Sequence, residues 1–168
     1  MLSLALAVGS SVAARRAGSQ PSQCRTGENV VYSCRFGAAV GSLCGSKGKL
    51  SYRFGPPGRP AIDIASDARW SNVRTATITG SGGFQHHIRF TRDGFDYIVF
   101  YAIAGQYAEV PNKSWSGIHV GRGDRDVRDL ACRGRPTMPP PGLGDLDRFL
   151  PAGVPSIEEP DDRYNMWY

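Results

Sequence analysis

Residues 84–103 read FQHHIRFTRDGFDYIVFYAI, and this stretch decides the fold class. Over residues 84–90 the side chains alternate between an apolar and a polar face, which is typical of a half-buried antiparallel strand. The pair Asp93-Gly94 that follows is a turn signal. Residues 95–103 are then apolar on both faces over most of their length, so we expect a central strand packed on two sides.

The same pattern extends from this stretch in both directions. Alternation recurs at residues 30–36 and 50–54, and glycine-rich turns separate the runs. Further strands are expected at residues 40–44, 60–65, 73–79, 116–120 and 127–132. The sequence therefore predicts an all-β fold, a small antiparallel β-barrel or sandwich of about eight strands that is stapled by disulfides.

The chain divides into three parts. Residues 1–18 place an apolar run before small residues, which indicates a secretory signal peptide, truncated or weak because no basic residue precedes the run. Residues 24–134 carry the strand pattern and form the predicted β-barrel domain. Residues 135–168 hold seven of the 12 prolines and more acidic than basic side chains, so we expect a Pro-rich, acidic, disordered tail. Its aromatic end, Tyr164–Tyr168, is a candidate docking segment.

Length and charge narrow the class of protein. With 168 residues the chain has room for one domain, and no apolar run reaches the roughly 20 residues that span a membrane. The whole chain has a formal net charge of +5, and residues 24–133 are more basic still, with 15 basic and nine acidic side chains. Such a domain attracts acidic proteins or anionic envelope ligands. Because its basic residues are spread along the chain, nucleic acid is not an expected partner.

The four cysteines indicate export. Cys24, Cys34, Cys44 and Cys132 form no C-x-x-C pair, so neither a zinc site nor a thioredoxin-like motif is expected. Two disulfides in an oxidising compartment are the simplest account, and three pairings are possible. We favour Cys34–Cys44, since a hairpin turning at Ala39 would set these two opposite one another. The second bridge would then be Cys24–Cys132.

No arrangement of residues indicates catalysis. His86 and His87 are neighbours on a predicted strand and point to opposite faces, so they cannot share a metal ion. No G-x-S-x-G motif occurs. Asp63, Asp93 and Asp96 could supply a carboxylate pair, but the latter two flank a predicted turn, where a structural role is expected. We therefore predict no catalytic residue, no cofactor and no metal.

Aromatic and basic side chains in polar loops are more informative. Residues of these types often dominate contacts with proteins or carbohydrates. The candidate binding residues of this kind are Trp70, Arg74, Tyr107, Lys113 and Trp115, and His87 joins them as the histidine on the exposed face of its strand.

Several segments resemble a group of small exported proteobacterial proteins without an established function. The segments are Tyr32–Phe36, Leu43-Cys44, Tyr52–Gly58, Ile88–Phe90, Asp96–Val99 and Cys132. This resemblance implies a periplasmic location in a Gram-negative bacterium. A weaker one is to the periplasmic inhibitors of C-type lysozymes, disulfide-stapled β-barrels that plug the lysozyme active site with a loop. It implies binding roles for Ser116 and Gly117, although the tyrosine of the inhibitors' Ser-Gly-x-x-Tyr segment is missing.

The sequence thus favours a non-catalytic periplasmic module that binds a protein or a cell-envelope ligand. Lysozyme inhibition and the neutralisation of an exported toxin, as by an immunity protein, are its sharpest versions. Because most lysozymes are basic, the positive charge of the domain opposes the first of these. The alternatives are a small hydrolase of envelope glycans and a structural envelope protein.

Overall fold

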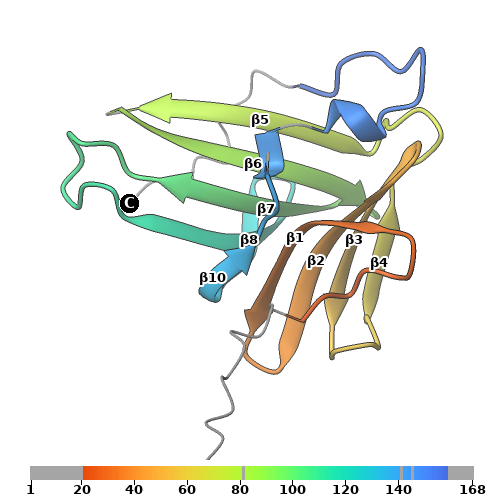
Figure 1. Cartoon of the computed structure of the whole chain (residues 1–168), viewed down its shortest axis with the longest axis horizontal. Helices are drawn as coiled ribbons and strands as arrows, with labels where there is room; N and C mark the ends of the chain where they lie inside the picture. Colours follow the sequence, from red (N-terminus) through yellow and green to blue (C-terminus); the bar gives the residue numbers. More distant parts are fainter. Residues whose placement is uncertain (1–20, 81, 141, 145, 159–168) are drawn as a thin grey trace, which may run out of the picture.

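The chain forms a sandwich of two five-stranded antiparallel sheets in a computed structural model that describes residues 21–158 except 81, 141 and 145 (Figure 1). The first sheet has the order β10-β1-β2-β3-β4, and the second has the order β5-β6-β7-β8-β9. In Figure 1 the strands of the second sheet run across the view, and those of the first sheet run steeply to them. The elements are β1 (Asn29–Phe36), β2 (Ala39–Ser46), β3 (Lys49–Gly55), β4 (Ile62–Ala65), β5 (Val73–Gly80), β6 (Gly83–Arg92), β7 (Phe95–Ile103), β8 (Ser114–Arg122), β9 (Arg125–Ala131), β10 (Arg133–Thr137), and the 3-10 turns η1 (Gly142–Gly144) and η2 (Asp147–Phe149).

The predicted all-β fold is confirmed, and the sandwich is the form that it takes. A strand is present at each of the nine expected places. β7 pairs with β6 on one side and with β8 on the other, as expected for a central strand, and both of its faces are buried. One strand was not predicted. β10 continues from β9 almost without interruption but pairs with β1, so the chain changes sheets at Cys132.

The main core lies between the two sheets. Tyr32 and Leu43 of the first sheet and Ile88 and Ile118 of the second are completely buried and belong to one apolar cluster. The sheets approach closely at Gly41, where a Cβ atom would lie 2.6 Å from the Ile118 side chain. Glycine is therefore needed at this position of β2.

The structure corrects the predicted disulfide pairing. The bonds are Cys24–Cys44 and Cys34–Cys132, with Cα–Cα distances of 5.3 and 5.8 Å. Phe36 pairs with Ala39, so the β1–β2 hairpin turns at Gly37-Ala38 and not at Ala39. Cys34 consequently stands opposite Gly41, on the face toward the second sheet, whereas Cys44 points to the other face. The two side chains cannot meet, and each finds a partner from a different segment.

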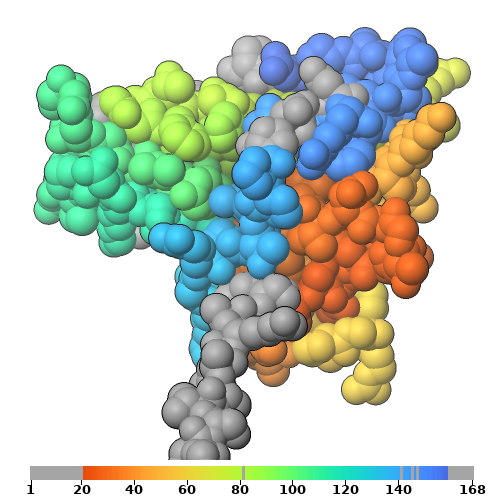
Figure 2. Space-filling view, in the orientation of Figure 1, coloured from red at the N-terminus to blue at the C-terminus, as the bar shows by residue number. Residues whose placement is uncertain are grey.

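The segment predicted as a disordered tail has a defined path over its described residues. β10 occupies residues 133–137, across the expected domain boundary at 134, and Leu143, Leu146, Phe149 and Ile157 are buried in the main core. Figure 2 shows this segment, in blue, lying against both sheets. The sequence did not reveal it because these apolar residues follow neither a helical nor a strand period. Residues 159–168, including the aromatic end, lie outside the described residues.

Among the described residues, the helical elements are two 3-10 turns of three residues each, and no helix could span a membrane.

Candidate functional site

The residues predicted to bind a partner do not form one site. Trp70 is completely buried in the main core, and its indole N–H donates a hydrogen bond to the Gly48 carbonyl at 3.3 Å. Its side chain has no surface with which to contact a partner, so the predicted binding role of Trp70 is corrected to a role in the core. The reason is that the aromatic ring fills space beneath the loop in which the sequence places it.

Four other candidates share a face of the second sheet. Arg74, His87, Trp115 and Gly117 lie on the side that points away from the first sheet, which we call the outer face, because their neighbours Ile88 and Ile118 belong to the main core. His87 is completely buried there, and Arg74 and Trp115 are half-buried. Gly117 is closed off, since a Cβ atom would lie 2.6 Å from the Leu130 carbonyl oxygen and 2.8 Å from the Phe100 ring.

The Ser116 side chain points to the other face, toward the first sheet, and has a structural role there. Its hydroxyl lies 2.7 Å from the carbonyl oxygen of Phe100 and 2.8 Å from the hydroxyl oxygen of Tyr32, on the opposite sheet. Burial raises the pKa of Tyr32 above its ordinary value, and this keeps the phenol neutral. Ser116 therefore joins the two sheets, and only its edge borders the surface.

Tyr107 and Lys113 lie in a loop of residues 104–113 that joins β7 to β8, which we call the projecting loop. It stands out at the left of Figures 1 and 2. The Ala104 N–H donates to the Lys113 carbonyl at 2.8 Å, and the Asn112 N–H donates to the Ala104 carbonyl at 3.0 Å, so the base of the loop is closed. Tyr107 is 77% exposed and Val110 is 52% exposed. In the described part of the chain, Val127 is the one other large apolar residue with an exposed side chain.

A pocket of about 570 Å³ adjoins this loop at the corner where β9 passes into β10, and we call it the corner pocket. Ser114 and Trp115, which follow the loop directly, form part of its wall. The other lining residues come from β7 to β10 and the segment after β10: Tyr101, Ser116, Ala131, Cys132, Gly134, Arg135, Pro136 and Met138. The pocket thus combines apolar and aromatic groups with a guanidinium and hydroxyls, a composition suited to binding a mixed polar and apolar group.

The carboxylates considered for hydrolysis are engaged in the fold. Asp63 forms ion pairs with Arg25 at 2.7 Å and with Arg53 at 3.1 Å. Asp96 pairs with Arg89 at 3.3 Å, and Asp93 takes a positive φ of 53° in the β6–β7 turn. None of the three faces another across a cleft in the described residues.

The histidines are likewise held by neighbouring strands. His86 lies 2.7 Å from the Thr77 hydroxyl, and burial lowers its pKa. His119 lies 2.7 Å from Asp129 and 3.4 Å from Asp126. His86 and His87 come from adjacent positions of β6 and point to opposite faces of the sheet, as predicted.

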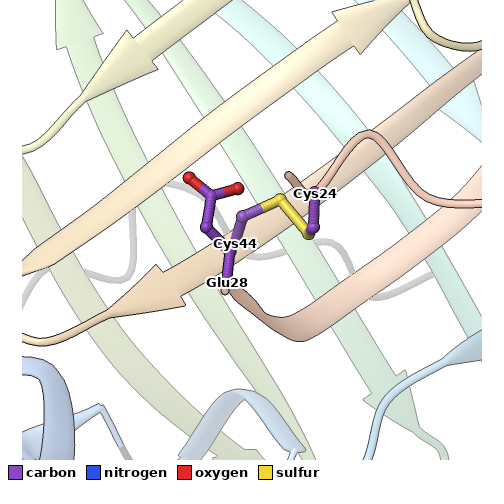
Figure 3. A group of neighbouring side chains, drawn as sticks. All are labelled: Cys24, Glu28 and Cys44. Carbon is purple, nitrogen blue, oxygen red and sulfur yellow. A yellow bond between two sulfur atoms is a disulfide. The ribbon is translucent and has the colours of Figure 1, made fainter. Parts of the chain in front are cut away.

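One group of side chains has the spacing of metal ligands. Cys24, Glu28 and Cys44 offer ligand atoms within 4.8 Å of one another. Figure 3 shows, however, that a disulfide joins the two cysteines beside the Glu28 carboxylate, and that carboxylate accepts hydrogen bonds from Arg53 at 2.5 and 2.9 Å. A cysteine binds a metal ion as its thiolate, and both sulfur atoms here are in the disulfide. This group therefore has a structural role.

Sequence reasoning missed Val110 and the β10 side of the corner pocket. Val110 carried no signal, because an isolated valine in a loop is equally compatible with burial. Arg135 and Met138 were assigned to the tail, and only the pairing of β10 with β1 brings them to the corner.

Comparisons of the chain with protein-family models, curated proteins and solved structures find no match.

Proposed function

We propose that this protein is a non-catalytic binding module of the bacterial periplasm that engages a protein partner through the projecting loop and the corner pocket. The observation that carries the proposal is the exposure of Tyr107 and Val110 on a loop whose base is closed by backbone hydrogen bonds. An exposed aromatic side chain on a preorganised loop is a common anchor of protein interfaces, because little conformational entropy is lost on binding.

Charge and disulfides support the rest of the proposal. The excess of basic side chains over residues 24–133 favours an acidic partner. The two disulfides fit an oxidising compartment such as the periplasm. In the inhibitor-like or immunity-like version of the function, the projecting loop enters the active site of the partner and the corner pocket receives a side chain next to it.

Capture from periplasmic extract of a Gram-negative bacterium tests the proposal. The bait is the full chain, compared with a double variant, Tyr107→Ser with Val110→Ser. The matched control is Val127→Ser, because Val127 is as exposed as Val110 but lies near the β8–β9 turn, whereas the β9 residue that lines the corner pocket, Ala131, is at the other end of that strand. We expect the wild type and the control to retain the same protein, and the double variant to lose it.

Two results would contradict the proposal. The first is equal retention by all three baits, which would place the contact elsewhere. The second is retention of envelope glycan or lipid alone, which would favour an anionic envelope ligand over a protein. Turnover of a glycan substrate by the purified chain would support the hydrolase alternative instead.

A further inference from the structure

The second sheet has a buried apolar surface that is separate from the main core. Ile98 and Ala102 of β7 are 0% exposed, and Phe100 is 9% exposed, yet none of them belongs to the cluster between the sheets. They alternate with the core residue Val99 and therefore point to the outer face. The outer face of a two-layer sandwich is ordinarily solvated. Its burial here indicates a third layer over β6, β7 and β8.

Polar side chains are buried on the same face. Gln85 and His87 are both 0% exposed, and the Gln85 side-chain amide lies 3.2 Å from the His87 Nδ1 atom. Withdrawing such groups from water is costly unless they are hydrogen-bonded. Their burial therefore favours a covering layer that hydrogen-bonds to them over a loosely associated chain.

The described chain ends beside the second sheet. The Thr75 N–H donates to the Ile157 carbonyl at 3.0 Å, and Glu158 forms a parallel bridge with Thr75, so the chain reaches residue 158 alongside β5, the edge strand of the second sheet. Ten residues follow. Extended, they reach about 33 Å, whereas the four strand spacings from β5 to β9 cover about 19 Å.

We propose that the C-terminal segment, residues 159–168, docks on the outer face of the second sheet. Its sequence, EPDDRYNMWY, ends in aromatic and apolar side chains that match Ile98, Phe100 and Ala102. Its acidic first half would pass over β5 and β6, which carry Arg74 and Arg89 on this face. The other end of the described chain starts farther from this face, since the Pro21 carbonyl accepts a hydrogen bond from Ser33 at 2.7 Å on the far side of the first sheet.

A chain shortened after Glu158 tests this docking. The probe is a labelled synthetic peptide of residues 159–168, and a peptide of scrambled order is the control. We expect the peptide to bind the shortened chain saturably, the full chain not to bind it, and the scrambled peptide to bind neither. The shortened chain should also enhance the fluorescence of an apolar dye severalfold, and the added peptide should reverse that increase.

The same readouts decide against the proposal if the peptide binds neither chain and the dye signal is unchanged by the truncation. A stable dimer formed equally by the full and the shortened chain would assign the outer face to a second copy and would also overturn it. Should the shortened chain fail to fold, the dye measurement is made on the full chain carrying Trp167→Ser with Tyr164→Ser. Trp167→Phe is then the conservative control, and it should behave as the wild type.

Discussion

Arg53 holds the segment before β1 against the first sheet. Its side chain is 1% exposed although it lies on the face away from the second sheet. Glu28 binds the guanidinium with both carboxylate oxygens, and Asp63 binds its Nε atom. The hydrogen bond from Arg53 lowers the pKa of Glu28 below its ordinary value. Together with the Cys24–Cys44 disulfide, this pair fastens the segment before β1 over the sheet.

The substitution Glu28→Gln tests this pair. It leaves the buried guanidinium with one carboxylate fewer, and we expect the free energy of unfolding at neutral pH to fall by about 2 kcal/mol. Because the folded pKa of Glu28 is depressed, its contribution is complete above the unfolded pKa and is lost as the pH falls through the folded pKa. Urea titrations at a series of pH values should show that the free energies of unfolding of the wild type and of Glu28→Gln converge at acidic pH. The exposed control Glu109→Gln should match the wild type, and a constant difference at every pH would contradict the assignment.

At the scale of elements, the hairpin β1–β2 and the segment after β10 decide how the sheets close. The turn at Gly37-Ala38 sets Cys34 toward Cys132, which fixes the point where the chain changes sheets. The segment then passes along the edge between the sheets. There the ring of Phe149 packs directly on Gly45, which has no room for a Cβ atom.

Phe149→Ala tests whether this segment is part of the fold. Since Phe149 is 4% exposed within the main core, we expect the free energy of unfolding to fall by about 3–5 kcal/mol. Chemical denaturation followed by circular dichroism measures the difference. Val127→Ala, at an exposed site, should change it by about 0.5 kcal/mol or less. A Phe149 variant as stable as that control would mean that the segment adds nothing to the core.

At the scale of the whole molecule, the sequence was sufficient for the strands but not for their assembly. Period-2 alternation and glycine turns located nine strands, and the two apolar faces of residues 95–103 correctly indicated a strand buried on both sides. The disulfide pairing could not be predicted, because it depends on a turn only slightly displaced from Ala39. The burial of Trp70 and of Leu143 depends on packing between distant segments, which no local pattern reports.

We propose that the projecting loop binds a protein partner, and the affinity of that partner is the decisive measurement. Calorimetric titration of the captured partner with the wild type, Tyr107→Ala and Val127→Ala gives the comparison. If Tyr107 anchors the interface, its removal should weaken binding by about thirtyfold or more, which corresponds to about 2 kcal/mol. Val127→Ala should leave the affinity unchanged. Equal affinities for the wild type and Tyr107→Ala would show that Tyr107 does not anchor the interface and that the partner binds elsewhere.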